Sequence, residues 1–187
     1  MRAALATFCF LLVGCAPHGV DLSVQAPATR ATEPPGYERA VVTRVIDGDT
    51  IEVRVTGRVE GPGAGEAELG RVVDVRLIGI DTPESVKPNT PVQCFAKEAT
   101  AATAALLDDR SVTLVKDVEE ADQYDRLLRY VYLGEEMVGA RLVANGYAFA
   151  YTYPPNVRHS ALHIALQRDA RRDDRGLWSP QTCNGKR

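Results

Sequence analysis

The stretch from Arg76 to Glu84, Arg-Leu-Ile-Gly-Ile-Asp-Thr-Pro-Glu, most constrains what this chain can fold into. Its apolar run stops at Asp81, and Pro83 then removes a ladder hydrogen bond and favours extended geometry at Thr82. A buried strand therefore delivers two carboxylates to a rigid turn at its end. The alternative is a plain turn in which Asp81 or Thr82 caps a short helix that Pro83 opens.

A second acidic turn, Ile-Asp-Gly-Asp-Thr at positions 46–50, lies between two strand-like runs at 41–45 and 51–55. Asp-Gly alone is a common hairpin signal, so this turn by itself indicates only a tight bend between strands. Together with the first turn and with Tyr-Asp-Arg at 124–126, it supplies hard oxygen ligands and guanidinium groups. This combination is typical of phosphodiester chemistry.

The charge of the whole chain gives no support to nucleic-acid binding. The 187 residues carry a formal net charge of −3, whereas nucleic-acid-binding proteins usually present a basic surface. Any affinity for phosphate must therefore be local and come from a metal ion and a few arginines. The length and the 45% hydrophobic content suit one domain with a single core.

The N-terminus has the features of an export signal. Arg2 precedes an apolar run from Ala3 to Val13, which is too short to span a bilayer as a stable helix. The run ends in Leu-Val-Gly-Cys at 12–15, which resembles the lipobox of bacterial lipoproteins. We therefore expect a signal peptide over 1–14, a lipid on Cys15 and an exported, membrane-anchored protein of the cell envelope. The alternative is an ordinary signal peptide with a chance cysteine.

Residues 15–37 contain prolines among serine, threonine and alanine without apolar periodicity, so we expect a flexible tether before a domain at 38–187. Cys94 and Cys183 are the two cysteines of that domain. An even pair in an oxidising compartment is expected to form a disulfide. Two free buried thiols are the alternative.

The remaining pattern predicts five short strands, one helix among them and two helices after them, in a small barrel-like α+β domain. A glycine-rich run at 56–70 is expected to be an extended loop. Gly146 is expected to cap the second helix. His159 and His163 share a face of the last helix, but no third ligand completes a zinc set, so we interpret them as structural or solvated. The expected strands are 40–45, 51–55, 72–80, 112–115 and 127–133, and the expected helices 94–107, 137–145 and 159–172.

Five motifs occur in order along the chain: Val-Ile-Asp-Gly-Asp-Thr at 45–50, the stretch at 76–84, Asp-Gln-Tyr-Asp-Arg at 122–126, Tyr-Thr-Tyr-Pro-Pro-Asn at 151–156 and Gly-Leu-Trp-Ser at 176–179. Together they resemble the staphylococcal nuclease (thermonuclease) family over about 37–179. The resemblance implies a five-stranded OB-fold β-barrel with three α-helices. It also implies a monomeric, Ca²⁺-dependent nuclease that cleaves DNA, with RNA as a second candidate substrate, and leaves 3′-phosphate ends.

The same resemblance implies a metal site and a base. Ca²⁺ would be held by the carboxylates of Asp49 and Asp81 and by the backbone carbonyl of Thr82, a set of hard oxygen donors. Glu84 would position and deprotonate the attacking water.

The resemblance further implies substrate contacts. Arg76 and Arg126 would grip the scissile phosphate with planar donor forks. Tyr124 and Tyr151 match the tyrosines that contact nucleotides in the family. For these two, ordinary half-buried packing is the alternative; for Arg126, the alternative is a surface ion pair with Asp122 or Asp125.

Three departures from the family pattern affect the expected rate, substrate length and salt optimum rather than the reaction type. Asp125 stands where the family often has glycine, the run at 56–70 lengthens a hairpin, and the whole chain is acidic. A second hypothesis is a noncatalytic OB-fold lipoprotein that binds nucleic acid. The complete catalytic set favours the enzyme: Asp49, Arg76, Asp81, Glu84 and Arg126.

Overall fold

The computed structural model describes residues 19–25, 32–85 and 91–187. The expected signal peptide at 1–14 and Cys15 lie outside the described residues. Within the described part of the chain, no helix is long and apolar enough to cross a membrane.

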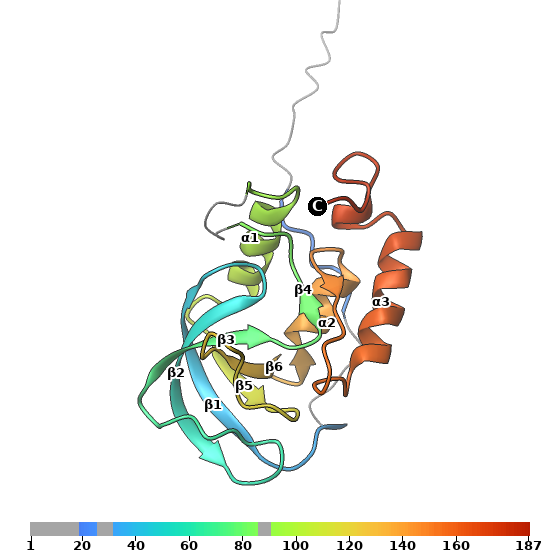
Figure 1. Cartoon of the computed structure of the whole chain (residues 1–187). Helices are drawn as coiled ribbons and strands as arrows, with labels where there is room; N and C mark the ends of the chain where they lie inside the picture. Colours follow the sequence, from blue (N-terminus) through green and yellow to red (C-terminus); the bar gives the residue numbers. More distant parts are fainter. Residues whose placement is uncertain (1–18, 26–31, 86–90) are drawn as a thin grey trace, which may run out of the picture.

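Five strands close into a barrel (Figure 1). Their order is β3-β2-β1-β5-β6, with antiparallel neighbours throughout, and β3 pairs in parallel with β6 to close the sheet. The expected α+β class and five-stranded OB-fold barrel are therefore confirmed. The barrel strands are β1 (Tyr37–Val45), β2 (Thr50–Val59), β3 (Val72–Leu77), β5 (Ser111–Val115) and β6 (Leu127–Leu133).

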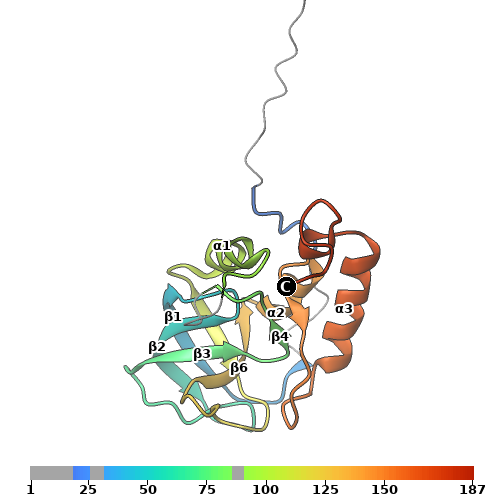
Figure 2. The same ribbon diagram turned by 45° about the horizontal axis from the view of Figure 1, so that its top comes forward.

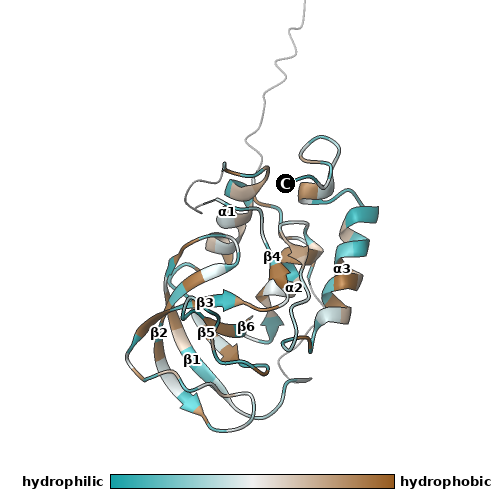
Figure 3. Ribbon diagram, viewed as in Figure 1, coloured by the Kyte–Doolittle hydropathy of each residue, from teal (hydrophilic) through white to brown (hydrophobic). Residues whose placement is uncertain are grey.

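Alternation of apolar and polar residues forms the barrel interior. Ile51, Val53 and Val55 of β2 are fully buried, as are Val75 and Leu77 of β3 at 0% and 2% exposure, because successive side chains of a strand point to opposite faces. Figure 3 shows hydrophobic and hydrophilic residues interchanging along these strands. Arg76, which lies between Val75 and Leu77, therefore points out of the core, as the alternation predicts.

Three shorter strands extend this frame. β7 (Glu136–Met137) pairs antiparallel with the last two residues of β6, and β4 (Ile80–Asp81) pairs with β8 (Phe149–Ala150) in a separate two-stranded sheet. The β4–β8 pairing joins the acidic turn after β3 to the segment that follows the second helix.

The helices pack around the barrel. They are α1 (Ala96–Leu107), α2 (Val138–Ala144), α3 (Ser160–Arg172) and the short 3₁₀ helix η2 (Gly176–Trp178). Figures 1 and 2 show α1 over one end of the barrel and α2 between the sheet and α3. Gly146 follows α2 with φ +75°, and its amide donates to the carbonyl of Val143 at 3.0 Å, which confirms the expected cap.

The glycine-rich run at 56–70 differs from the expected extended loop. β2 continues to Val59, and Gly63, Ala64, Gly65 and Ala67 are buried. Sequence alone suggested freedom because glycine is conformationally permissive, but glycine equally allows close approach of a backbone to a side chain. Here close approach decides the structure.

That run covers a buried ion pair. The side chains of Glu38 and Arg129 are both 0% exposed, and Arg129 Nε donates to Glu38 Oε2 at 2.8 Å. A Cβ atom on Gly65 would lie 1.8 Å from Arg129 Nη2. Only a residue without a side chain fits there, so Gly65 lets the loop close over the pair.

Part of the expected tether is packed on the domain. Val24 exchanges two hydrogen bonds with the Asn145 side chain, at 3.0 and 2.7 Å, and the amide of Asp21 donates to Tyr147 Oη at 2.8 Å. The expectation of a free tether over 15–37 does not hold for residues 19–25, because side chains of the domain supply partners that composition cannot reveal.

The second described stretch of the tether is held by a carboxylate. The Glu33 side chain is 2% exposed and pairs with Arg158 at 2.7 Å and with His159 at 2.6 Å. Tyr132 also donates to it. His159 is therefore structural, as expected, and it works by fixing an upstream segment.

The disulfide between Cys94 and Cys183 is present, with Cα atoms 5.9 Å apart, which confirms the expected pairing. It ties the residues after η2 to the start of α1. Figure 2 places the C-terminal end of the chain between α1 and α3, near β4.

Candidate active site

A pocket of about 710 Å³ opens where β3, β4 and the turn before β6 meet. Its lining combines six carboxylates with three guanidinium groups and three tyrosines. The charged lining residues are Asp47, Asp49, Asp81, Glu84, Glu119, Asp122, Arg76, Arg126 and Arg187, and the tyrosines are Tyr124, Tyr151 and Tyr153.

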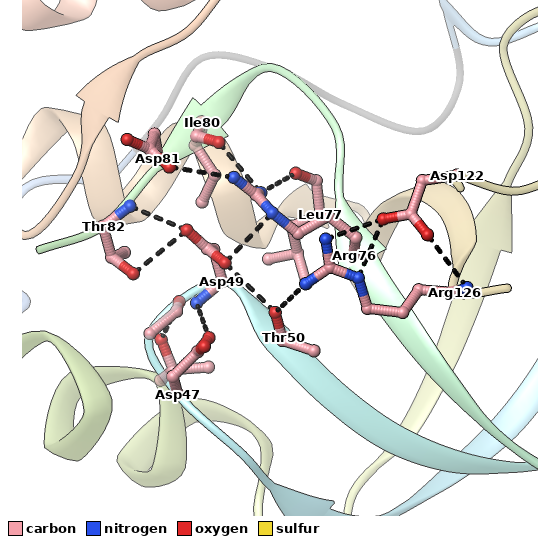
Figure 4. Close-up of polar contacts among 12 residues, drawn as sticks. Asp47, Asp49, Thr50, Arg76, Leu77, Ile80, Asp81, Thr82, Asp122 and Arg126 are labelled. Carbon is pink, nitrogen blue, oxygen red and sulfur yellow. Dashed lines mark hydrogen bonds and ion pairs between the residues drawn. The ribbon is translucent and has the colours of Figure 1, made fainter. Parts of the chain in front are cut away.

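Asp49 joins the two acidic turns. It follows β1, and its Oδ2 accepts hydrogen bonds from the Thr82 amide at 2.7 Å and the Thr82 hydroxyl at 3.0 Å (Figure 4). A Cβ on the preceding Gly48 would meet the Thr82 side chain at 2.7 Å. The close approach of the turns therefore requires glycine at that position.

Arg76 bridges the two carboxylates that the family resemblance assigns to metal. Its Nε lies 3.2 Å from Asp49 Oδ1 and its Nη2 lies 3.1 Å from Asp81 Oδ1. Its Nη1 donates to the carbonyls of Leu77 and Ile80, at 2.7 and 2.9 Å. The guanidinium is thus fixed by four contacts, to two carboxylates and two carbonyls, as Figure 4 shows, and only 15% of the side chain is exposed.

Asp49 is electrostatically unlike an ordinary aspartate. Burial raises its pKa above the usual range, and the nearby charge of Asp47 adds to the rise. The charge of Arg76 and the hydrogen bonds from Thr82 act in the opposite direction without cancelling it. The pocket therefore holds a carboxylate whose charge its own neighbours only partly compensate.

Arg126 lies on another side of the pocket, just before β6. Its Nε donates to Asp122 Oδ2 at 2.8 Å, its Nη2 lies 2.6 Å from the same oxygen, and its Nη1 donates to Thr50 Oγ1 at 3.5 Å. Burial acts to raise the pKa of Asp122, but the hydrogen bonds from Arg126 and from the amide of Tyr124 hold it below its usual range. Both interpretations of Arg126 are thus combined, because it pairs with Asp122 and also lines the pocket.

The departure at Asp125 has a local explanation. Its φ is +62°, a left-handed conformation that glycine adopts freely and aspartate tolerates better than most residues. The turn between Asp122 and Arg126 keeps its shape, since the Asp125 amide donates to the Asp122 carbonyl at 3.1 Å.

Glu84 lines the pocket, and its backbone is held from both sides by one residue. Its amide donates to Gln93 Oε1 at 2.8 Å, and its carbonyl accepts from the Gln93 amide at 2.9 Å. The third strand expected at 72–80 ends earlier, at Leu77, and Gly79 with φ +84° turns the chain into β4. That bend carries Asp81, Thr82 and Glu84 to the pocket.

The tyrosines are too exposed to be ordinary packing. Tyr124 is 70% exposed, Tyr151 47% and Tyr153 61%, and the rings of Tyr151 and Tyr153 stack at 6.2 Å. Exposed aromatic rings in a pocket that also contains arginines are suited to stacking against bases. Sequence reasoning singled out Tyr124 and Tyr151 but missed Tyr153, which the spacing of the motif at 151–156 would have placed beside Tyr151.

Sequence reasoning also missed Arg187. Its Nη2 lies 2.5 Å from Asp81 Oδ2, and its guanidinium carbon lies 4.4 Å from the centre of the Phe149 ring. No local sequence signal points to this contact, which depends on the disulfide and on the path of the chain after η2.

The pocket supplies some of the oxygen donors that a calcium site needs. Asp49 and Asp81 come together through Arg76 and Thr82, and the three expected ligand residues are side by side. Among the described residues, no group of three or more His, Cys, Asp or Glu side chains could hold a metal ion. Two carboxylates and a backbone carbonyl would need water to complete the coordination shell of a hard cation.

Comparisons with known proteins show which family the chain resembles. The family model described as "Staphylococcal nuclease homologue" matches residues 74–180. The thermonuclease of Staphylococcus intermedius is 42% identical over 141 residues, which cover 75% of this chain and 76% of that protein. The thermonuclease of Staphylococcus hyicus is 41% identical over 138 residues, or 74% of each chain. The endonuclease YncB of Bacillus subtilis (strain 168) is 33% identical over 138 residues, or 73% of this chain and 59% of that protein.

Proposed function

The chain belongs to the staphylococcal nuclease family and is a nuclease, and from that premise we propose that it hydrolyses DNA with the help of Ca²⁺ and leaves 3′-phosphate ends. The observation that carries the proposal is the Arg76 bridge between Asp49 and Asp81, with Arg126 and Glu84 lining the same pocket. A noncatalytic binding module would not need this complete set.

The chemistry of the donor set supports calcium. Asp49, Asp81 and the carbonyl of Thr82 would hold the ion, and such a mixture of carboxylate and carbonyl oxygens suits Ca²⁺ better than softer metals. A bound Ca²⁺ would neutralise charge on the phosphate oxygens as the transition state develops.

The arginines position and stabilise the phosphodiester. Arg76 is anchored by two carboxylates and two carbonyls, so its orientation costs little further entropy when a phosphate arrives. Arg126 is held by Asp122 at a different point of the lining. Two planar donor forks reaching the same pocket would bind the equatorial oxygens as their charge increases.

Glu84 would act on the attacking water. A carboxylate in the pocket can orient a water and accept its proton while the bond from phosphorus to the 5′ oxygen breaks. The double backbone contact with Gln93 keeps this residue at its place in the lining.

The exposed tyrosines favour an unpaired strand as substrate, because bases must leave the duplex to stack on Tyr124 or Tyr151. Single-stranded DNA is therefore the first substrate to test, with single-stranded RNA as the second.

The proposal is tested by incubating the purified protein with both oligonucleotides in Ca²⁺ and in excess EGTA. We expect cleavage only with Ca²⁺, 3′-phosphate ends by mass spectrometry, and loss of calorimetrically measured Ca²⁺ binding in Asp81→Ala. Glu60→Ala removes an exposed carboxylate that lies outside the pocket lining and serves as the matched control. Undiminished cleavage in EGTA would contradict the metal requirement.

We further propose that Cys15 is lipidated and anchors the protein in the cell envelope, on the strength of the export signal and the Leu-Val-Gly-Cys motif at 12–15. Cys15→Ser should move the protein from the membrane fraction to the soluble fraction and remove the lipid from the mature mass. Unchanged fractionation together with an unlipidated mature mass would count against the anchor.

A further inference from the structure

The segment Cys183–Arg187 folds back onto the body of the domain. The disulfide to Cys94 fixes its first residue beside α1. The amide of Asn184 donates to the Ser179 carbonyl at 3.0 Å, and the amide of Gly185 donates to the Leu177 carbonyl at 2.9 Å. The backbone is therefore held by one covalent bond and two hydrogen bonds before it reaches Arg187.

The β4–β8 pairing prepares a place for Arg187. Asp81 and Phe149 are register partners in that small sheet, so a carboxylate and an aromatic ring lie next to each other. The guanidinium contacts both, with Nη2 2.5 Å from Asp81 Oδ2 and its central carbon 4.4 Å from the ring centre. The ring in turn meets Trp178 edge to face at 5.1 Å, which keeps it in position.

Of the three pocket arginines, Arg187 is the most open to a ligand. Its side chain is 42% exposed, compared with 15% for Arg76 and 29% for Arg126. Arg76 is surrounded by carboxylates and carbonyls, and Arg126 is held by Asp122. Arg187 therefore keeps an accessible side at the rim of the pocket.

The charge balance of the pocket makes this third arginine important for an anionic substrate. Six carboxylates line the pocket against three guanidinium groups, and the whole chain has a net charge of −3. A nucleic-acid strand that approaches such a surface is attracted only where the positive charge of nearby arginines outweighs the negative charge of the carboxylates. Arg187 supplies one of the three positive charges that the described residues place in this lining.

We propose that Arg187 is a phosphate-binding residue of the substrate site, which contacts a nucleic-acid phosphate next to the scissile one on the Asp81 side of the pocket. The inference rests on the nuclease function of this pocket. The planar guanidinium offers paired donors to phosphate oxygens, and the Phe149 ring behind it limits its rotation. The disulfide maintains the site by holding the segment on which Arg187 stands.

The same contact has an opposite interpretation, in which Arg187 blocks the Asp81 carboxylate. A blocking residue would lower activity on every substrate, and its removal would raise activity. A phosphate-binding residue would improve binding only of substrates long enough to reach it. The length of the substrate therefore separates the two roles.

The test compares Arg187→Ala with Lys186→Ala in Ca²⁺, on a dinucleotide with one phosphodiester and on a single-stranded DNA of about ten nucleotides, a common site size. Lys186 carries the same charge one residue away and lies outside the pocket lining in the described part of the chain. For Arg187→Ala we expect KM on the longer DNA to rise about fivefold, the size of one partly exposed ionic contact, with kcat unchanged. KM on the dinucleotide should not change.

Two further measurements depend on the contact itself. In a Glu84→Gln background, which slows cleavage, Arg187→Ala should reduce the slope of log affinity against log salt by about 0.7, the release expected for one single-strand phosphate contact. The double variant Cys94→Ser/Cys183→Ser should show the same length-dependent rise in KM although Arg187 is still present.

Three results would overturn the inference. They are a gain of activity on both substrates in Arg187→Ala, an equal loss in Lys186→Ala, and no change in KM on the longer DNA. A parent protein that cleaves neither substrate would instead contradict the proposed function, so the two failures are distinguishable.

Discussion

Arg126 and Arg129 stand three residues apart at the start of β6, yet they belong to two different ionic clusters. Arg126 pairs with Asp122 at the pocket with 29% of its side chain exposed. Arg129 pairs with Glu38 under the glycine-rich run, and both side chains are 0% exposed. Each arginine is paired with a carboxylate, and the two pairs differ in how far they are covered from solvent.

The covered cluster is compensated from within. Arg129 donates to Glu38, to Glu120 and to the carbonyls of Glu120 and Leu128. Burial acts to raise the pKa of Glu120, but the amide of Glu66 and the charges of Arg129 and Lys116 hold it below its usual range. Such a cluster can hold strands together, but its charged groups are not accessible to a ligand.

The pocket cluster is compensated only in part. The pKa of Asp49 is raised, chiefly by burial, although Arg76 and Thr82 oppose the rise. The pocket is also open, whereas Gly65 closes the other cluster. The comparison shows that solvent access separates the two roles of an arginine that contacts carboxylates. Where solvent and substrate can reach the arginine, it can form part of a binding site. Where a glycine-containing loop covers it, the same contact only stabilises the fold.

The largest expected effect comes from removing Glu38, which tests whether the covered cluster stabilises the fold. Glu38→Ala leaves Arg129 buried without its main partner, so we expect the free energy of unfolding in urea to fall by about 3 to 5 kcal/mol. Glu52→Ala, which removes a partly exposed partner of the exposed Arg44, should cost at most about 1 kcal/mol. Replacing both members of the pair, as in Glu38→Met/Arg129→Met, should recover most of the loss. A cost below about 1 kcal/mol for Glu38→Ala would contradict a structural role.

The second test concerns a buried polar group behind the pocket wall. His163 is 1% exposed, both ring nitrogens lack a hydrogen-bond partner among the described residues, and the ring lies against Gly79. Burial lowers its pKa from 6.5 to about 4, and the neighbouring His159 adds to the shift. The pocket wall therefore contains a buried imidazole that no hydrogen bond from the described residues compensates.

This shift makes stability depend on pH. Below pH 6.5 the unfolded chain binds a proton at His163 that the folded chain refuses, so stability should fall as pH decreases from 6.5 to about 4, by about 3 kcal/mol in total. Urea unfolding across this range measures the slope. His163→Leu cannot titrate and should flatten the curve; an unchanged slope would assign the pH dependence to other groups.

The third test exchanges lysine for arginine in each cluster. Arg126→Lys keeps the charge but loses the planar fork, so kcat should fall on the order of 10²-fold while the melting temperature hardly moves. Arg129→Lys should instead lower the melting temperature and leave kcat per folded molecule unchanged. Cleavage by Arg126→Lys within about threefold of the parent at saturating substrate would favour the surface ion pair.

The smallest expected effect comes from replacing Gly65, the residue that lets the loop close over Arg129. In Gly65→Ala the new Cβ would lie 1.8 Å from Arg129 Nη2 and 2.7 Å from Glu38 Oε2, so the loop or the pair must shift. We expect a loss of about 1 to 3 kcal/mol in unfolding free energy, as for other overpacked sites. Because the pocket is not touched, kcat and KM should stay at parent values. A change in kcat without a change in stability would show that the two clusters are coupled.

Much of the barrel and of the pocket could be predicted from sequence. Alternation along β2 and β3 is a local signal, and each acidic turn carries several site residues within a few positions. Asp49, Arg76, Asp81, Thr82 and Arg126 therefore came together as expected.

The parts that sequence did not predict depend on distant contacts. Glu38 and Arg129 are 91 positions apart, and each looks alone like a surface charge on a strand. The cover formed around Gly65 and the pocket contact of Arg187 depend on the same kind of tertiary approach. Periodicity reports which face a residue takes, but not which remote segment will cover that face.

The packing of residues 19–25 limits how far the enzyme could work from a membrane. The Asp21 amide is fixed to Tyr147, so if Cys15 carries a lipid, only six Cα-to-Cα steps separate the anchor from the folded body. At no more than about 3.5 Å per residue, these allow about 20 Å, whereas a free tether over 15–37 would allow about 75 Å. The nuclease would then act only within a thin layer at the membrane surface, on nucleic-acid strands that touch or cross the envelope. Strands in the surrounding solution would be out of its reach.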